Sequence, residues 1–133
     1  MSTLPHPGAE DAFTLRLGGG PEAAAVARRY LSRLRGDLDP PLMETLRLLV
    51  TELVANSIKH ALADSVELKV LVGRSAVWVE VVDEGPGFEP VARTDDSRVD
   101  SGWGLFLVER LANRWGVVRD GDVTKVWFEL LRG

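Results

Sequence analysis

The stretch Leu48-Leu-Val-Thr-Glu-Leu-Val-Ala-Asn-Ser-Ile-Lys-His-Ala61 decides the fold that we expect for this chain. Apolar residues recur at helical spacing through it, which predicts a helix over about residues 42–63. Glu52 and Asn56 lie four residues apart, so their side chains stack on successive turns beside the apolar stripe. Polar groups at the rim of a core are unfavourable without partners, so this pair is either exposed to solvent or part of a site.

Length and composition are those of one ordinary globular domain. The chain has 133 residues, 45% hydrophobic and 27% charged, with a net charge of -4. This acidic balance gives no reason to expect a nucleic-acid partner. The absence of cysteine excludes disulfides and thiol chemistry, and two histidines are too few for a histidine-based metal site. No leader peptide or membrane-spanning run is visible, so we expect a cytoplasmic protein with no membrane partner.

The first third of the chain predicts a tail, a strand and a helix. Residues 1–11 are rich in proline, glycine and acids and form a flexible N-terminal tail, so that the domain spans residues 12–133. Residues 13–17 alternate as a short strand, and Pro21 then begins a helix. Arg28 and Arg29 point away from the apolar stripe of that helix. They either face solvent or form a basic contact patch for a protein partner.

The rest of the chain predicts two hairpins separated by a polar segment and a helix. Residues 66–82 form the first hairpin and residues 117–130 the second. Residues 89–101 lack periodicity, which is typical of a functional lid or a disordered loop. Residues 105–115 predict a helix that ends at Gly116. This order favours an α+β fold, a two-layer α/β sandwich with a mixed, mostly antiparallel sheet and helices on one face.

Two glycine-containing turns stand beside these elements. Asp83 ends a strand, and Gly85 and Gly87 after it let the backbone turn sharply and let a flat ligand approach. Gly102-x-Gly104 opens a helix, whose free backbone N–H groups attract an anion such as phosphate. An ordinary turn explains either signal taken alone.

The order of these motifs resembles the Bergerat-fold ATPase superfamily, which contains gyrase, histidine kinases and the anti-sigma-factor serine kinases. Glu-x-x-x-Asn lies on a helix, Asp-x-Gly-x-Gly follows a strand, and Gly-x-Gly-Leu begins a helix after a polar lid. The resemblance covers about residues 12–131 and implies a histidine-kinase-like ATPase domain with an ATP lid. It is most similar to the small anti-sigma-factor serine kinases through residues 52–61, 103–116 and 126–130.

The resemblance implies a role for each motif residue. It implies ATP and Mg²⁺ as cofactors, with Asn56 as a magnesium ligand and Glu52 as the general base for a substrate hydroxyl. Asp83 matches the acid that accepts a hydrogen bond from the adenine amino group. The other nucleotide-binding positions that it implies are Gly85, Gly87, Gly102, Trp103, Gly104, Leu105 and Phe106.

The resemblance also implies an activity and partners. It implies a protein serine/threonine kinase that phosphorylates an anti-sigma-factor antagonist, sequesters a sigma factor and forms a homodimer. One alternative is a nucleotide-binding regulator that docks a protein partner through Arg28 and Arg29 without kinase activity. Another is an ATPase subunit of a larger switch, in which the lid gates a conformational change.

Three positions leave questions open. Family members place threonine directly before the final strand, whereas here Lys125 separates Thr124 from Val126. A one-residue shift turns a side chain to the other face of a strand, which argues against an adenine contact from Thr124. His60 is either a packed residue or a phosphate contact, and Lys59 is either exposed or close to the nucleotide.

Overall fold

A computed structural model describes residues 11–34, 38–61, 65–84 and 103–132. The described part of the chain forms five strands and three helices, in the order that the sequence predicts. They are β1 (Asp11–Gly18), α1 (Ala23–Leu31), α2 (Pro40–Ala61), β2 (Ser65–Val72), β3 (Ala76–Glu84), α3 (Trp103–Leu111), β4 (Arg114–Asp120) and β5 (Val123–Leu131).

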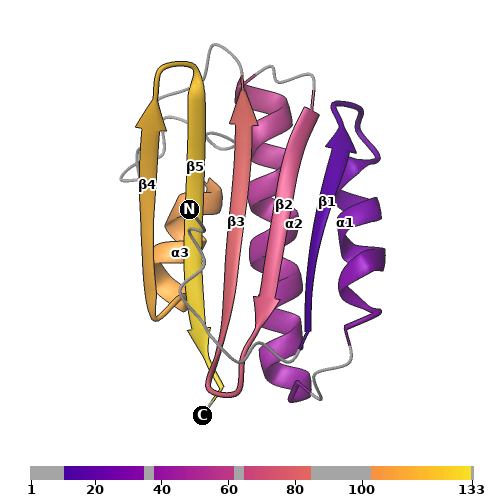
Figure 1. Ribbon diagram of the computed structural model, residues 1–133, viewed down its shortest axis with the longest axis vertical. Coiled ribbons are helices and arrows are strands. Elements are labelled where there is room, and N and C mark those ends of the chain that lie inside the picture. Colours follow the sequence, from indigo (N-terminus) through magenta and orange to yellow (C-terminus); the bar gives the residue numbers. More distant parts are fainter. Residues whose placement is uncertain (1–10, 35–37, 62–64, 85–102, 133) are drawn as a thin grey trace.

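The strands form one sheet in the order β1-β2-β3-β5-β4, and the helices lie together behind it (Figure 1). The α+β sandwich with helices on one face is therefore confirmed. Among the described strands every pairing is antiparallel, so the mixed character that we expected is absent from this part of the sheet. Because β5 inserts between β3 and β4, the last strand lies inside the sheet and not at its edge.

The core lies between the sheet and α2, which packs on β2, β3 and β5. Strand residues alternate between the two faces, so one apolar row per strand points toward the helices. Burial of each such valine or leucine contributes roughly 1.5–3 kcal/mol to folding. In the centre of this core lie Leu49, Val50, Leu53, Val54, Leu68, Val70, Val79, Val81, Val126 and Phe128.

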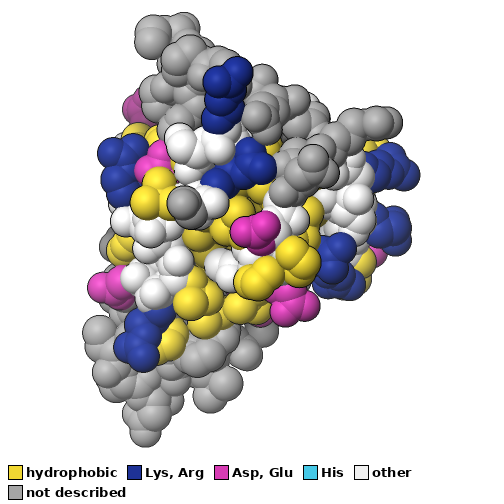
Figure 2. Space-filling view, turned by 90° about the horizontal axis from the view of Figure 1, so that it is seen from below, with side chains coloured by type: hydrophobic (Ala, Val, Ile, Leu, Met, Phe, Trp, Pro, Cys, Tyr) yellow, Lys and Arg dark blue, Asp and Glu magenta, His cyan; other side chains and the backbone are white. Residues whose placement is uncertain are grey.

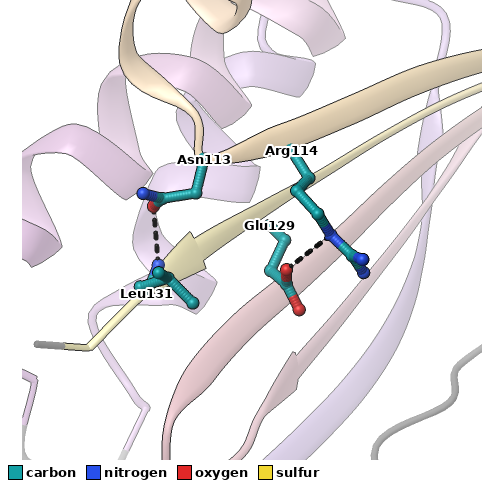
Figure 3. A network of polar contacts seen from close by, with 4 residues as sticks. All are labelled: Asn113, Arg114, Glu129 and Leu131. Carbon is teal, nitrogen blue, oxygen red and sulfur yellow. Dashed lines mark hydrogen bonds and ion pairs between the residues drawn. The ribbon is translucent and has the colours of Figure 1, made fainter.

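The connection from α3 to β4 corrects one prediction. We expected the helix to continue to Trp115, but it ends at Leu111, and Trp115 and Gly116 belong to β4. The backbone N–H of Asn113 donates to the carbonyl of Glu129, and the Asn113 side chain accepts from the backbone N–H of Leu131 at 2.8 Å (Figure 3). These bonds replace the next helical turn.

An ion pair holds the new strand in place at the same point. The Arg114 Nε atom lies 2.9 Å from Glu129 Oε1 across the β4–β5 ladder (Figure 3). Trp115 fits a helical spacing from Leu111 as well as strand alternation with Val117, which is why periodicity alone misplaced it.

Figure 2 shows the lower end of the molecule in Figure 1, where β3 begins and β5 ends. Hydrophobic side chains gather in the middle of this surface, with charged side chains around them (Figure 2). Leu131, at the end of β5, is 53% exposed there, and it lines a shallow cavity with Pro41 and Leu42 at the start of α2.

Two other sequence predictions concern segments outside the described residues. The lid predicted for residues 89–101 and nearly all of the predicted tail fall there, so both remain predictions. No helix in the described ranges combines the length and hydropathy needed to cross a bilayer.

Candidate functional site

Asp83 lies at the end of β3 in a row of side chains that faces the helices. The antiparallel register pairs Asp83 with Val66 on β2 and with Thr124 on β5, and Thr124 with Arg119 on β4. Directly paired residues project to the same face of a sheet, so the four side chains share the helix-covered side. The next row into the core is entirely apolar, and consists of Leu68, Val81, Val126 and Val117.

Asp83 is a buried acid with an open acceptor. The residue is 2% exposed, and the hydroxyl of Ser57 on α2 donates a hydrogen bond to its carboxylate. Among the described residues none donates to its Oδ1 atom. Burial raises the pKa of Asp83, while the Ser57 hydrogen bond and the positive charge of Arg119 act to lower it. Three other buried side-chain atoms of the described residues, Arg47 Nε, Thr51 Oγ1 and Glu80 Oε1, also make no hydrogen bond, so the open acceptor alone does not mark a site. Asp83 is distinguished by its place at the end of β3 beside Ser57 and Thr124, where a ligand could supply the donor.

The α2 helix presents the other predicted polar residues along its length. Asn56 is buried and directly precedes Ser57, so the amide lies close to the end of α2 that contacts Asp83. Glu52 is half-buried and lies one turn, about 5–6 Å along the axis, before Asn56. Along α2, Glu52 comes first and Asn56 follows one turn later. Asp83 on β3 meets the helix at the next residue, Ser57.

Thr124 does not turn away as the one-residue shift suggested. It is 1% exposed and is paired directly with Asp83 on the helix-facing side. The predicted change of face is wrong, because Thr124 continues the same alternation as Val126 and Phe128 while Lys125 points to the opposite face. The hydroxyl of Thr124 is thus available beside the acid of the candidate site.

The first turn of α3 supplies backbone donors. Trp103 and Gly104 are its first two residues, and the buried side chain of Leu105 anchors the turn to the core. The side chain of Phe106 is half-buried under the guanidinium of Arg110, whose Cζ lies 5.3 Å from the ring centroid. Leu105 and Phe106 therefore pack with their side chains, and any anion here would meet the backbone N–H groups of the turn.

Some predicted positions are not part of the described structure. Gly85, Gly87 and Gly102 lie outside the described residues, and so do the side chains of Lys59 and His60. Their predicted roles stay predictions.

Sequence reasoning missed Ser57 and Arg119. Ser57 occupies a position of the apolar stripe, four residues after Leu53, and a hydroxyl there was a signal that could have been noticed. Arg119 lies beside Thr124 through the local β4–β5 hairpin, but no local signal brings it into the row of Asp83, because that depends on β5 pairing with β3.

Two observations limit what else the site could be. Within the described ranges no group of three or more histidine, cysteine or acidic side chains gathers. A cavity of about 370 Å³ lies between the β1–α1 connection and α2, but its lining is mainly apolar and lacks the row of Asp83. It is lined by Gly19, Gly20, Pro21, Ala24, Ala55 and Ile58.

The family of the chain follows from this fold and from its sequence. Residues 19–130 match the histidine kinase-like ATPase domain family, and the chain therefore belongs to that family. The resemblance to Bergerat-fold ATPases, and among them to anti-sigma-factor kinases, is confirmed.

Similar proteins place the chain more narrowly. Serine-protein kinase RsbW of Listeria monocytogenes serotype 4a is 30% identical over 133 residues, covering 87% of this chain and 85% of the relative. The serine-protein kinase RsbW of serovar 1/2a of the same species is 29% identical over the same shares. A crystal structure of the RsbU and RsbW domains of Rv1364c from Mycobacterium tuberculosis has the same fold, with a TM-score of 0.70 and 19% identity. The match covers 91% of this chain and 32% of that longer chain.

Proposed function

We propose that this protein is an ATP- and Mg²⁺-dependent protein serine kinase that phosphorylates an anti-sigma-factor antagonist and sequesters a sigma factor. The single observation that carries the proposal is the open Oδ1 acceptor of buried Asp83. The names of the relatives, serine-protein kinases that match over most of their length, support the choice of reaction.

In this proposal the row at the end of β3 recognises the base of ATP. The exocyclic amino group of adenine donates to Asp83, whose Oδ1 has no donor among the described residues. Ser57 holds the carboxylate, and the hydroxyl of Thr124 lies beside it as a further polar contact for the base. The backbone N–H groups at the start of α3 face the phosphates, because a helix N-terminus attracts anions.

The polar residues of α2 act on the phosphate end of the nucleotide. Asn56 would hold Mg²⁺ through its amide oxygen, and phosphate and water would complete the oxygen shell that this ion prefers. When bound, the ion neutralises the charge of the transferring phosphoryl group. Glu52, one turn away and half-buried, accepts the proton of the substrate serine hydroxyl as general base.

The exposed side of α1 is the surface that we propose for the protein partners. Arg28 and Arg29 are exposed there beside Tyr30, and the Arg33 Cζ lies 4.8 Å from the Tyr30 ring centroid. A basic surface with an aromatic side chain fits an acidic partner segment. The buried position of Thr124 opposite Asp83 supports nucleotide binding over the alternative of a docking protein without kinase activity, to which a shifted threonine would have given some weight. A homodimer remains a prediction from the resemblance.

Two measurements test the proposal. Calorimetry with Mg-ATP should show binding, and absence of binding at millimolar ATP would overturn the proposal. Proteins captured from the native host should include an antagonist that gains phosphoserine when incubated with Mg-ATP and the kinase.

A matched pair of variants tests the general base. Glu52→Gln should lower phosphoryl transfer at least about 100-fold while Mg-ATP affinity changes little, because the base acts on the hydroxyl. Glu44→Gln on the exposed side of the same helix is the control and should leave transfer unchanged. Unchanged transfer in Glu52→Gln would show that Glu52 is not the base.

A further inference from the structure

We propose that Arg119 is a positioning residue for nucleotide recognition, which keeps the buried carboxyl group of Asp83 in its charged, hydrogen-bond-accepting form. The inference rests on the proposed function, because it concerns the base-recognition end of the same site. Arg119 itself need not touch the nucleotide in this proposal.

The sheet register gives the geometry. Asp83, Thr124 and Arg119 are consecutive members of one row across β3, β5 and β4 on the helix-facing side. Directly opposed residues have Cβ atoms about 5 Å apart, so the backbones of Asp83 and Arg119 are separated by about 10 Å. Thr124, the residue between them, carries no charge, and the positive charge of Arg119 acts on the acid across it.

The described side chains around Asp83 hold few other charges. Ser57 faces it from α2, Val66 from β2 and Thr124 from β5, and all three are uncharged. Arg119 on β4 is the one charged member of this described set. The nearby cation on β5, Lys125, lies on the other face of the sheet and pairs with Glu80 at 3.8 Å.

These surroundings act on Asp83 in opposite directions. Burial raises the pKa of its carboxyl group, whereas the Ser57 hydrogen bond and the charge of Arg119 lower it. Removing Arg119 leaves burial opposed by Ser57 alone, so the acid would take up a proton at a higher pH. Because Arg119 is exposed, solvent and salt screen its charge and the expected effect is modest.

Protonation matters because adenine offers a donor at this position. A neutral carboxyl group accepts a hydrogen bond from an amino group less strongly than a carboxylate does. The preference for ATP over purine riboside triphosphate, which lacks the amino group, therefore measures the charged state of Asp83. This preference should fall at acidic pH, and it should fall at a higher pH when Arg119 is absent.

Calorimetry tests this with Mg-ATP and Mg-purine riboside triphosphate between pH 5.5 and 8. Arg119→Met should lower the preference for ATP by roughly threefold at the acidic end, and Arg119→Lys should restore it. Arg114→Met is the matched control, because Arg114 lies on the same strand but pairs with Glu129 away from the row. An equal loss of affinity for both nucleotides at every pH would show a direct contact with the nucleotide and overturn the inference.

A second readout needs no nucleotide. Carboxyl carbon NMR of the nucleotide-free protein follows the titration of Asp83 directly. The titration should move to higher pH in Arg119→Met and return toward that of the unmodified protein in Arg119→Lys, and an unchanged titration in Arg119→Met would overturn the inference. If no form binds Mg-ATP, the proposed function fails, while this titration still decides the role of Arg119.

Discussion

Strand β3 carries two buried carboxyl groups, Glu80 and Asp83, on opposite faces of the sheet. Glu80 is fully buried, yet the Trp78 Nε1 atom donates to its Oε2 at 3.0 Å and Lys125 Nζ lies 3.8 Å from its Oε1. Asp83 is almost as buried, and each acid has one oxygen without a hydrogen bond, Oε1 of Glu80 and Oδ1 of Asp83. Glu80 obtains its partners from its own strand and from β5, as expected of a structural residue. The open oxygen of Glu80 faces the ammonium group of Lys125, whereas that of Asp83 lies at the end of its strand beside the uncharged Ser57 and Thr124. This difference in surroundings separates the candidate site from the scaffold.

The largest expected effect is that of Asp83→Asn on nucleotide binding. Loss of the charged acceptor should weaken Mg-ATP binding about 100-fold in calorimetry, close to 3 kcal/mol. The variant removes the open acid without removing Ser57 or Thr124. An affinity within a few-fold of that of the unmodified protein would show that Asp83 does not bind the adenine.

The same substitution should raise the stability of the nucleotide-free protein at neutral pH. The pKa of Asp83 is raised in the folded state, so between the unfolded and the folded pKa the folded protein binds more protons than the unfolded chain. Its unfavourable contribution is absent below the unfolded pKa and grows as pH rises through the raised folded value. Thermal unfolding from pH 4 to 8 should therefore show a steeper loss of stability with pH in the unmodified protein than in Asp83→Asn.

Glu80→Ala should lower the stability of the protein and leave nucleotide binding nearly unchanged, the reverse of what we expect for Asp83→Asn. It leaves the Trp78 indole N–H and the Lys125 ammonium without this carboxylate, and should lower the free energy of unfolding by about 2 kcal/mol. Mg-ATP affinity should stay within twofold, because Glu80 lies on the face away from Asp83. Urea unfolding and calorimetry measure the two effects, and a large affinity loss would erase the distinction between the two acids.

Gly116→Ala tests the packing on the face of the sheet away from the helices, with a smaller expected loss of stability. A Cβ atom at this position would lie 2.6 Å from Trp127 Nε1, so the ring must move. We expect a loss of about 1–2 kcal/mol in urea unfolding. Gly18→Ala is the control, since a Cβ there meets no atom within 4 Å. Equal stability of both variants would show that the tryptophan ring shifts freely.

The smallest expected effect is that of Thr124→Val. The substitution keeps the shape and removes the hydroxyl beside Asp83, so Mg-ATP affinity should fall about fivefold, or 1 kcal/mol. Thr124→Ser keeps the hydroxyl and should retain most of the affinity. If the Thr124→Val variant bound Mg-ATP as tightly as the unmodified protein, Thr124 would contribute only packing at this position.

Local periodicity predicted most of the fold, because α2 and the two hairpins have strong patterns of their own. It failed where a residue fits both the helical and the strand period, as Trp115 does. There the hydrogen bonds of Asn113 to β5 end the helix and begin the strand. The misplacement of Thr124 came from counting against a family pattern. The alternation Thr124, Val126, Phe128 was already in the sequence.

The candidate site was less predictable than the fold. Residues on one continuous element could be found in the sequence, as Glu52 and Asn56 were. The place of Arg119 in the row of Asp83 requires the pairing of β3 with β5, which joins distant parts of the chain. The open acceptor of Asp83 requires the packing of α2 against the end of β3, and neither follows from local spacing.

The stacked indoles of Trp78 and Trp127 have an optical consequence. Their ring centroids lie 4.6 Å apart with an angle of 6° between the planes, one ring on β3 and the other on β5. Two identical chromophores at this separation couple their electronic transitions, so the pair should give a circular dichroism couplet that a single indole lacks. The same two strands carry Asp83 and Thr124 at their ends. The protein thus contains an unlabelled spectroscopic probe of whether the two strands that form the base end of the site remain paired.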